Sequence, residues 1–324
     1  MAIEDLVTSE VIAEALTEAD VTLQEREYPE INIREAIPVS DTLEKGLEYS
    51  KFGIVGTRGS LDDGLIGNKT SSLIEVGTEI EWKKAPAEDW AKMAEWNVVE
   101  VEKAARFGVA LDTARLDTVY QNALATIQKA GYRGHKQSKN MEGLLTSASV
   151  EQVTPAVNKD LNAMTADEVV TFILSAYDKA YAKSGYTVMP NKIAIDSRDL
   201  MIIMGKFSTS VVVGIDGMPF SALDKITAAL RKASGNDTFS VDFVKVPMQL
   251  AQKVKNATTS RLVVYSYNEA YVDMEVMMPE LITEISHGLL TFQAGYRSRF
   301  TGARWKEPDS AVYVDYPITP TDRI

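Results

Sequence analysis

The sequence predicts an α+β fold in which long extended segments accompany a compact region of alternating helices and strands. Three observations predict it. A glycine-punctuated stretch over residues 43–82 favours a long hairpin, an apolar repeat over 97–130 favours one very long helix, and helix and strand patterns alternate from about residue 161 onward. With 45% hydrophobic and 25% charged residues, the composition is typical of a folded chain rather than a disordered one.

The N-terminal residues carry most of the negative charge. Residues 1–50 contain thirteen acidic and three basic side chains, a net charge of −10 out of a total of −12. Leu6, Val7 and Val11 belong to a row of apolar residues three to four positions apart, which predicts an amphipathic helix. That helix would pack either on its own domain or on another subunit. Residues 21–45 are expected to be extended, because two prolines there disfavour helix in the residues before them.

The composition also excludes several classes of protein. The 274 residues after position 50 are nearly neutral, and no segment concentrates Lys and Arg, so strong direct binding to DNA is not expected. Arg297 and Arg299 beside Phe300 fit strand alternation, with stacking on single-stranded nucleic acid as the weaker alternative. No apolar run approaches the ~18 residues that span a bilayer, and the chain contains no cysteine for disulfides or thiolate metal sites.

The stretch over residues 43–82 is predicted to form an extended hairpin. It contains seven glycines, and Asp62 and Asp63 followed by Gly64 predict a turn between its two strands. An isolated hairpin with few large apolar side chains is marginally stable at best. We therefore expect this hairpin either to be mobile or to lie against another chain, and we adopt the second interpretation.

The next segment predicts the longest helix. Asn97 and Glu100 form a capping-box pattern at its start, apolar residues follow at steps of three, four and seven as far as Ile127, and Gly131 is expected to end it. At 1.5 Å per residue such a helix would be about 48 Å long.

Shorter elements follow. Capping-box patterns at Thr165 with Glu168 and at Ser221 with Asp224 predict two helix starts. The expected elements are helices over 165–184, 197–204 and 221–230, strands over 191–195, 239–244 and 261–267, and mostly strand over 288–316.

A search for catalytic and metal-binding patterns yields no candidate. His135 and His287 are the only histidines, and neither has a second ligand at helical metal spacing. The sequence contains no P-loop, no dinucleotide-binding glycine motif and no nucleophile elbow. With 46 acidic residues, a carboxylate pair for acid–base chemistry stays open but no pair stands out. The prediction is no enzyme, no cofactor and no metal, with an α+β hydrolase as a remote alternative.

The order of these features resembles the major capsid protein family of tailed bacteriophages, whose fold is shared with encapsulin shell proteins. Three motifs sharpen the resemblance. Gly143-Leu144-Leu145-Thr146 is similar to a Gly-Leu-Leu-Asn motif of relatives, with Thr in place of Asn, and residues 261–265 resemble a late strand of the axial domain. The closing run is similar to an Arg-x-x-Gly…Pro…Tyr-x-Asp pattern, at Arg299, Gly302, Pro308, Tyr313 and Asp315.

The resemblance implies a division of the chain. Residues 1–42 would form an N-terminal arm and residues 43–82 an extended E-loop. Residues 83–160 would belong to a peripheral domain with its spine helix over 97–130, and residues 161–278 to an axial domain. The strands over 279–324 would complete the peripheral domain.

The implied function is self-assembly into the icosahedral shell of a tailed bacteriophage, in the virion capsid, after assembly in the host cytoplasm. Pentamers and hexamers of the chain would enclose the DNA without binding it strongly, and portal, scaffolding and decoration proteins would be partners. An encapsulin-like compartment is the alternative. The residues expected at contacts between subunits are Leu6, Val7, Val11, Arg58, Asp62, Asp63 and Lys69. The acidic arm would bind a surface lined by Lys or Arg on a neighbouring subunit.

Overall fold

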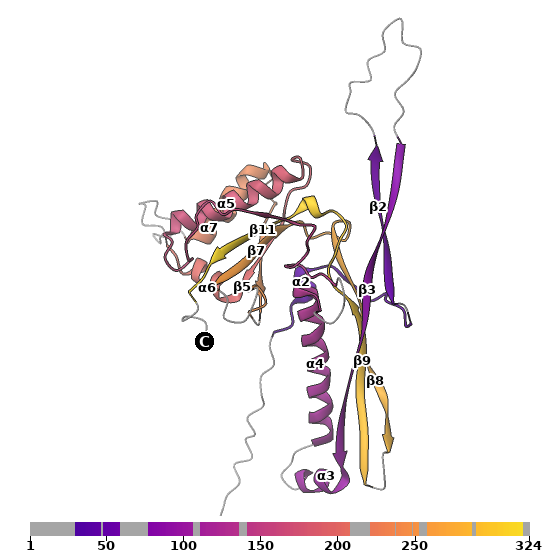
Figure 1. The fold of residues 1–324 in the computed structure, drawn as a ribbon. Coiled ribbons are helices and arrows are strands. Elements are labelled where there is room, and N and C mark those ends of the chain that lie inside the picture. The colour runs from indigo at the N-terminus through magenta and orange to yellow at the C-terminus, as the bar shows by residue number, and fades with distance from the viewer. Residues whose placement is uncertain are drawn as a thin grey trace, which may run out of the picture.

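The structure is a computed structural model of the 324-residue chain. It describes residues 30–46, 48–58, 77–105, 111–135, 141–207, 221–236, 238–247, 249–252, 258–286 and 290–319. The expected mixture of helix and strand is confirmed. Figure 1 shows a long, narrow part in which helices lie beside long strands, joined near its middle to a compact part in which helices cover a sheet.

The narrow part is a sheet in the order β1-β8-β9-β3-β2. Its longest strand, β3, pairs with β2 through residues 77–86 and with β9 through residues 87–97, so one continuous strand links the hairpin to the far end of the molecule (Figure 1). The strands are β1 (Val39–Ser40), β2 (Tyr49–Arg58), β3 (Gly77–Asn97), β8 (Val272–Ser286) and β9 (Thr291–Thr301), with β10 (Arg304–Trp305) paired to β8.

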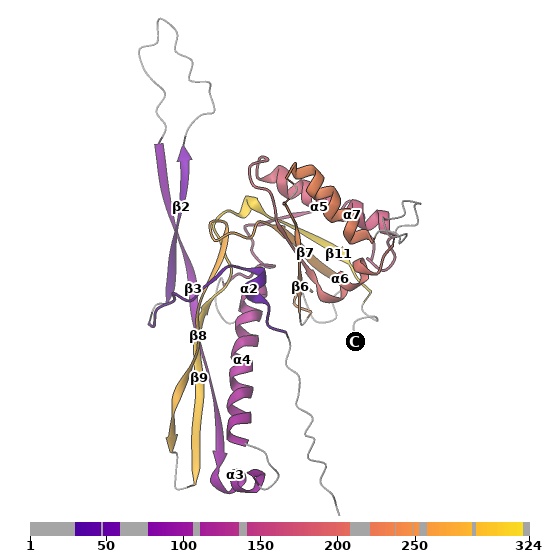
Figure 2. The same cartoon turned by 180° about the vertical axis from the view of Figure 1, so that it is seen from behind.

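The residues predicted to form one long helix contain two helices. α3 spans Val98–Ala105 and α4 spans Leu111–Arg133, and Figure 2 shows α3 lying across the end of α4. The predicted helix over 97–130 is therefore wrong as a single element, and the spine is α4, about 35 Å long. The Asn97 side chain does accept a hydrogen bond from the Val99 N–H, at 2.9 Å, as expected of a cap.

The end of α4 also differs from the prediction. Gly131 lies inside the helix, where an added Cβ would come within 2.5 Å of Ile33 Cδ1. The glycine with a left-handed backbone is Gly134, at φ +72°. The Gly131 position thus serves close packing rather than helix termination.

The compact part is a five-stranded sheet in the order β4-β11-β7-β5-β6, with three helices. The predicted capping boxes at Thr165 with Glu168 and at Ser221 with Asp224 are confirmed. The strands are β4 (Glu151–Val153), β5 (Lys192–Asp196), β6 (Asp242–Val246), β7 (Thr259–Tyr265) and β11 (Val312–Pro317), the helices are α5 (Ala166–Lys183), α6 (Ser197–Met204) and α7 (Ala222–Ser234), and Pro308–Ser310 is a 3-10 turn.

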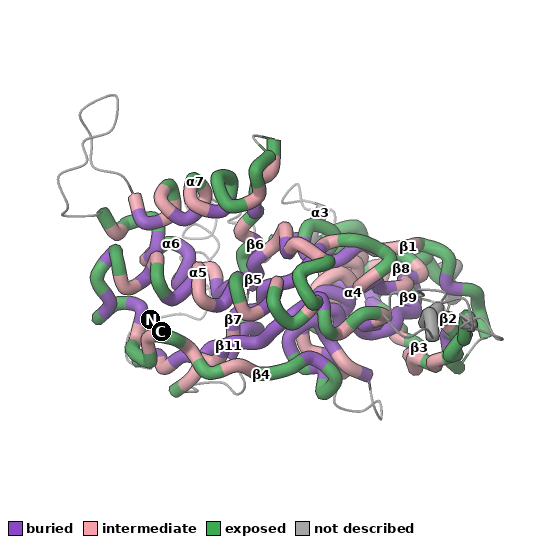
Figure 3. The backbone as a smooth tube through the Cα atoms, turned by 90° about the horizontal axis from the view of Figure 1, so that it is seen from above, coloured by how far each residue is buried: buried purple, intermediate pink, exposed green. Residues whose placement is uncertain are grey.

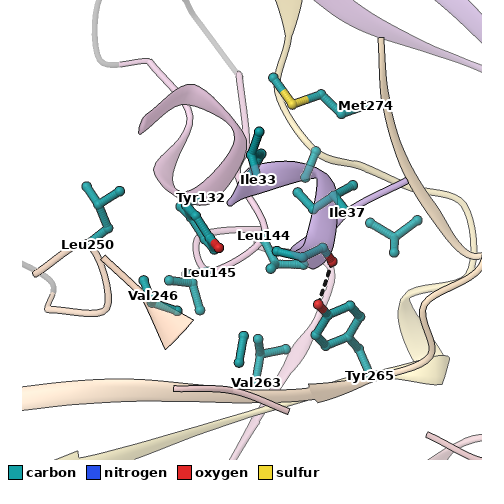
Figure 4. Close-up of a cluster of buried hydrophobic side chains, with 14 of the residues drawn as sticks. Ile33, Ile37, Tyr132, Leu144, Leu145, Val246, Leu250, Val263, Tyr265 and Met274 are labelled. Atoms are coloured by element: carbon teal, nitrogen blue, oxygen red, sulfur yellow. Dashed lines mark hydrogen bonds between the residues drawn. The ribbon is translucent and has the colours of Figure 1, made fainter. Parts of the chain in front are cut away.

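Strand alternation gives this sheet two buried faces. Ile193 and Ile195 pack in the cluster formed with α5, α6 and α7, whereas Ala194 between them belongs to the cluster on the opposite side. The opposite cluster contains the end of α4 and α2 (Ile33–Ala36) (Figure 4). Figure 3 shows buried backbone running through the sheet and the adjoining end of α4. The junction between the two parts of the subunit is therefore itself a core.

Three of the expected segment assignments need correction. The boundary at 278/279 falls inside β8, which belongs to the narrow sheet from its first residue. β11, expected in the peripheral domain, pairs with β7 in the compact sheet, and β4 from the expected peripheral segment joins it there.

Residues 30–42, the end of the expected arm, and Leu43 after them pack against their own chain. Ile33, Ile37 and Leu43 are buried, α2 interrupts the extended chain that was predicted over 21–45, and β1 pairs with β8. Residues 30–42 of the expected arm therefore pack on their own chain rather than only on a neighbouring subunit. Residues 1–29 lie outside the described residues.

Candidate functional site

The hairpin of β2 and β3 projects beyond the rest of the subunit (Figures 1 and 2). Its strands pair continuously from Tyr49 opposite Pro86 to Arg58 opposite Gly77. Along this projection Tyr49, Ile80 and Trp82 are 54%, 56% and 68% exposed. Large apolar side chains this exposed, gathered on one element, are typical of a surface that another protein covers.

A buried ion cluster fastens the base of the hairpin. The Arg304 guanidinium donates to both carboxylate oxygens of Asp273 on β8 and, at 2.6 Å, to Ser50 Oγ on β2. It also pairs with Glu275 at 2.8 Å. Burial opposes the charge, but the contacts with Asp273 and Glu275 raise the pKa of Arg304 above its ordinary value. The cluster therefore holds the hairpin at a fixed place on the sheet.

The narrow sheet continues to a second exposed apolar region at the far end of the molecule. Met93 on β3 is 63% exposed, and Leu281 on β8 is 54% exposed. From Met278 onward, β8 pairs with β9 on one side and with no other strand among the described residues on its other side. An open strand edge with apolar side chains is a second surface suited to contact with another chain.

Motif residues from three distant parts of the sequence meet where the two parts of the subunit join. Gly143 and Gly302 leave no room for a side chain, because an added Cβ would lie 2.4 Å from the Arg133 N and 1.9 Å from the Glu142 O, respectively. The Tyr313 hydroxyl donates to the Leu144 O at 2.6 Å. The Gly-Leu-Leu-Thr motif and the closing run thus form one close-packed joint.

Arg261 connects this joint to the compact sheet. Its guanidinium makes two bonds to the Asp315 carboxylate, at 2.6 and 3.1 Å, and donates to the Leu145 O at 2.8 Å. It also lies over the Tyr313 ring, 4.6 Å from the centroid. Sequence reasoning selected Arg261, Tyr313 and Asp315 only through the resemblance, and the structure brings them together.

Asn32 also belongs to this joint, although the sequence analysis did not identify it. Its backbone N–H donates to Gln128 Oε1 on α4 at 2.7 Å, and its side-chain amide donates to the Lys245 O on β6 at 2.6 Å. Burial, together with the charges of Glu35 and Glu30, raises the pKa of Tyr132, whose hydroxyl donates to Asn32 Oδ1 at 2.9 Å. One side chain therefore ties the start of the described chain to both parts of the subunit.

Most of the predicted contact residues lie outside the part of the chain that the structure describes. Leu6, Val7, Val11, Asp62, Asp63 and Lys69 lie outside the described residues. The Arg58 backbone ends β2 opposite Gly77, and its side chain is not described. Their roles between subunits stay predictions. Sequence reasoning missed Ile80 and Trp82, although their alternation on a glycine-containing strand was a usable signal.

The described residues offer no chemical centre. They contain no group of three or more His, Asp or Glu side chains placed to hold a metal ion. His135 lies in the chain just after α4, and His287 lies outside the described part. No helix in the described ranges has the length and apolar character needed to cross a membrane. The prominent features of the described residues are exposed apolar surfaces and the joint that positions them.

Comparison with known proteins assigns these features to a family. The sequence profile described as Major capsid protein matches residues 62–316. A search of curated protein sequences found no match. Among solved structures, the chain is similar to the capsid of Myoviridae phage XM1, with 15% identity, a TM-score of 0.75, and 94% of this chain and 98% of that chain covered.

Two further solved structures have the same fold. A chain of Mycobacterium phage Bobi matches with 12% identity and a TM-score of 0.63 over 96% of this chain and 98% of that chain. A chain of Mycobacterium phage Adephagia matches with 10% identity and a TM-score of 0.61 over 96% of each chain. With the profile match spanning most of its length, the chain belongs to the major capsid protein family and is a shell-forming subunit.

Proposed function

We propose that this chain assembles with copies of itself, as pentamers and hexamers, into the icosahedral head of a tailed bacteriophage that encloses the genome. Assembly takes place in the host cytoplasm before the shell becomes part of the virion. Portal, scaffolding and decoration proteins are the further partners that the resemblance implies. The role is structural rather than enzymatic, because the features that dominate the described residues are contact surfaces.

The β2–β3 hairpin is the observation that carries this proposal. Ile80 and Trp82 are more than half exposed on an element that lies away from the body of its own subunit (Figure 1). Burying such side chains against a neighbour stabilises an assembly by roughly 25 cal/mol per Å² of apolar surface. A rigid base at Arg304 keeps the hairpin ready for that contact, which lowers the entropy cost of association.

The test is the assembly state of the purified full-length chain. We expect size-exclusion chromatography followed by negative-stain electron microscopy to show closed particles of one or a few diameters. A chain that stays monomeric or forms only small oligomers under all assembly conditions would contradict the proposal. The contents of the particles distinguish the two alternatives. Particles filled with nucleic acid would indicate a genome container, whereas particles filled with a folded cargo protein would indicate an encapsulin-like compartment.

A further inference from the structure

An open cavity with apolar walls lies where the described chain begins. It has a volume of about 300 Å³ and is bounded by α2, α4 and the strands β1 and β8. α2 lies beside the C-terminal end of α4 in both views of the ribbon (Figures 1 and 2). An apolar cavity of about half that volume accommodates benzene, so this one has room for an aromatic side chain. Its walls include Ile31, Val39, Tyr120, Leu124, Val276 and Met278.

The apolar walls of this cavity are partly accessible to solvent. Tyr120 and Leu124 on α4 are half-buried, and Met278 on β8 is 36% exposed. Protein interiors are close-packed, and voids larger than a water molecule are few. A cavity of this size with accessible apolar walls is therefore suited to a large side chain from outside the described residues.

The three polar residues that line the cavity restrict what that side chain can be. Asn32 already uses its amide nitrogen and its amide oxygen in hydrogen bonds, and Arg34 is paired with Asp41 at 2.9 Å. Glu35 is exposed, and its carboxylate accepts no hydrogen bond from a residue in the described ranges. A tyrosine side chain would place its ring against the apolar walls and its hydroxyl near an acceptor.

The chain just before the cavity contains such a side chain. Tyr28 is the only aromatic residue in the first thirty positions of the sequence. The Glu30 carbonyl accepts a hydrogen bond from Gln128 at 2.8 Å, so the chain is held on α4 two residues after Tyr28. Ile31, which lines the cavity, is three positions from Tyr28, and this spacing limits their Cα separation to about 11 Å. Tyr28 is therefore confined to the neighbourhood of the cavity.

We propose that this cavity is the docking site of the Tyr28 side chain of the same chain. The ring packs against Tyr120 and Leu124, and the hydroxyl donates a hydrogen bond to the Glu35 carboxylate. Pro29 favours an extended backbone in the residue before it, which lowers the entropy cost of docking. The short tether also gives Tyr28 of the same chain a high effective concentration, which favours it over a second copy.

A docked Tyr28 fixes the point from which the acidic residues before it leave the subunit. Residues 1–27 hold eight acidic side chains and one basic side chain. In the proposed shell, these residues would start from one place on α4, which lowers the entropy cost of ordering them. The docking itself takes place within one chain, so the unassembled subunit tests it. Its failure is therefore distinguishable from a failure of the proposed function.

Fluorine NMR on the unassembled full-length chain tests the docking with the Tyr28 side chain in place. The chain is labelled with 3-fluorotyrosine, and the resonance of Tyr28 is the one that Tyr28→Phe removes. We expect this resonance to lie away from the position of a solvent-exposed fluorotyrosine and to move toward that position in Leu124→Ala. Thr126→Ala is the matched control, because Thr126 is half-buried two positions further along α4 and points to the opposite side of the helix.

Three results of this measurement would overturn the proposal. The first is a Tyr28 resonance that already lies at the position of an exposed fluorotyrosine in the wild-type chain. The second is an equal response of the resonance to Leu124→Ala and Thr126→Ala. The third is a displacement that grows with the concentration of the chain, which would show that a second copy supplies or binds the tyrosine.

A double-mutant cycle gives an independent measurement. Tyr28→Ala should lower the folding equilibrium constant of the unassembled chain roughly tenfold in urea denaturation, and Tyr28→Phe should lower it less. In a Leu124→Ala background, the effect of Tyr28→Ala should shrink to about threefold or less, because its contact is already lost. In a Thr126→Ala background the full effect should remain. Additive effects of Tyr28→Ala and Leu124→Ala would contradict the docking.

Discussion

At the scale of single residues, the Arg304 cluster shows how a buried charge supports a contact surface. Arg304 is 5% exposed and joins β10 to β8 and β2 through side-chain hydrogen bonds and ion pairs. Removing one partner of a buried ion pair leaves the other charge uncompensated, which costs more than an exposed pair contributes. The main role of the cluster is therefore to fix the position of the hairpin, and the loss of Arg304 is expected to cost more stability than the loss of an exposed salt bridge.

Arg304→Met should lower the free energy of unfolding of the unassembled subunit by about 3 kcal/mol, because Asp273 and Glu275 lose their shared cation. Urea denaturation measures the change. Lys159→Met is the control: Lys159 pairs with Glu168 at an exposed site, where loss should cost less than about 1 kcal/mol. Equal effects of the two substitutions would contradict the structural role of the cluster.

Glu280 gives a pH-dependent prediction. Hydrogen bonds from Lys45 and Arg297 lower the pKa of Glu280 below its ordinary value. A group with a lowered folded-state pKa contributes stability above its unfolded-state value of about 4.3, and that contribution is lost as the pH falls through the folded-state pKa. Glu280→Gln should therefore destabilise the unassembled subunit above about pH 5, with a difference from wild type that vanishes toward strong acid. A difference that is constant with pH would show that charge is not the cause.

At the scale of elements, local sequence patterns predicted the starts of helices correctly, whereas one helix break and one long strand were missed. The capping boxes of α5 and α7 depend on residues three positions apart, and the sequence placed both helix starts. Gly108, between α3 and α4, was the unused signal for dividing the predicted long helix, because a glycine in a helix interior costs about 1 kcal/mol. β8 was missed because Pro279 weakens its strand pattern; the pairing with β9 is irregular between Met277 and Glu280.

The joint between the two parts of the subunit gives a prediction about packing. Gly302→Ala would place a methyl group 1.9 Å from the Glu142 backbone oxygen, and a backbone atom cannot move aside as a flexible side chain can. We expect a loss of about 2–3 kcal/mol in the free energy of unfolding.

The control for this substitution is Gly205→Ala at the end of α6, where the nearest atom would be 3.5 Å away. Its effect on thermal unfolding should be small. A Gly302→Ala subunit as stable as the Gly205→Ala subunit would show that the close approach of these backbones is not required.

At the scale of the whole molecule, the sequence predicted the fold class, and its resemblance predicted the family. It could not predict that Ile33, Ile37 and Leu43 are buried against their own chain. The hydrogen bonds that hold Asn32 reach Gln128 and Lys245, 96 and 213 positions away, and no local pattern encodes such contacts. The expected contact residues between subunits lie outside the described residues, apart from the Arg58 backbone, and their roles stay predictions.

The β2–β3 hairpin gives a prediction about the assembly of whole subunits. Ile80 and Trp82 are exposed in the subunit, so replacing both with Ser should change the stability of the unassembled chain little, within roughly 0.5 kcal/mol per site. At an interface, an anchoring aromatic side chain contributes about 2 kcal/mol or more. The double substitution should therefore separate folding from assembly.

Sedimentation velocity on full-length wild type and on the Ile80→Ser, Trp82→Ser variant, with thermal unfolding of each, tests the central claim most directly. We expect wild type to sediment as shell-sized particles and the variant to stay as small species with an unchanged unfolding midpoint. Shells of normal size and yield from the variant would contradict the claim that the hairpin surface is completed by neighbouring copies.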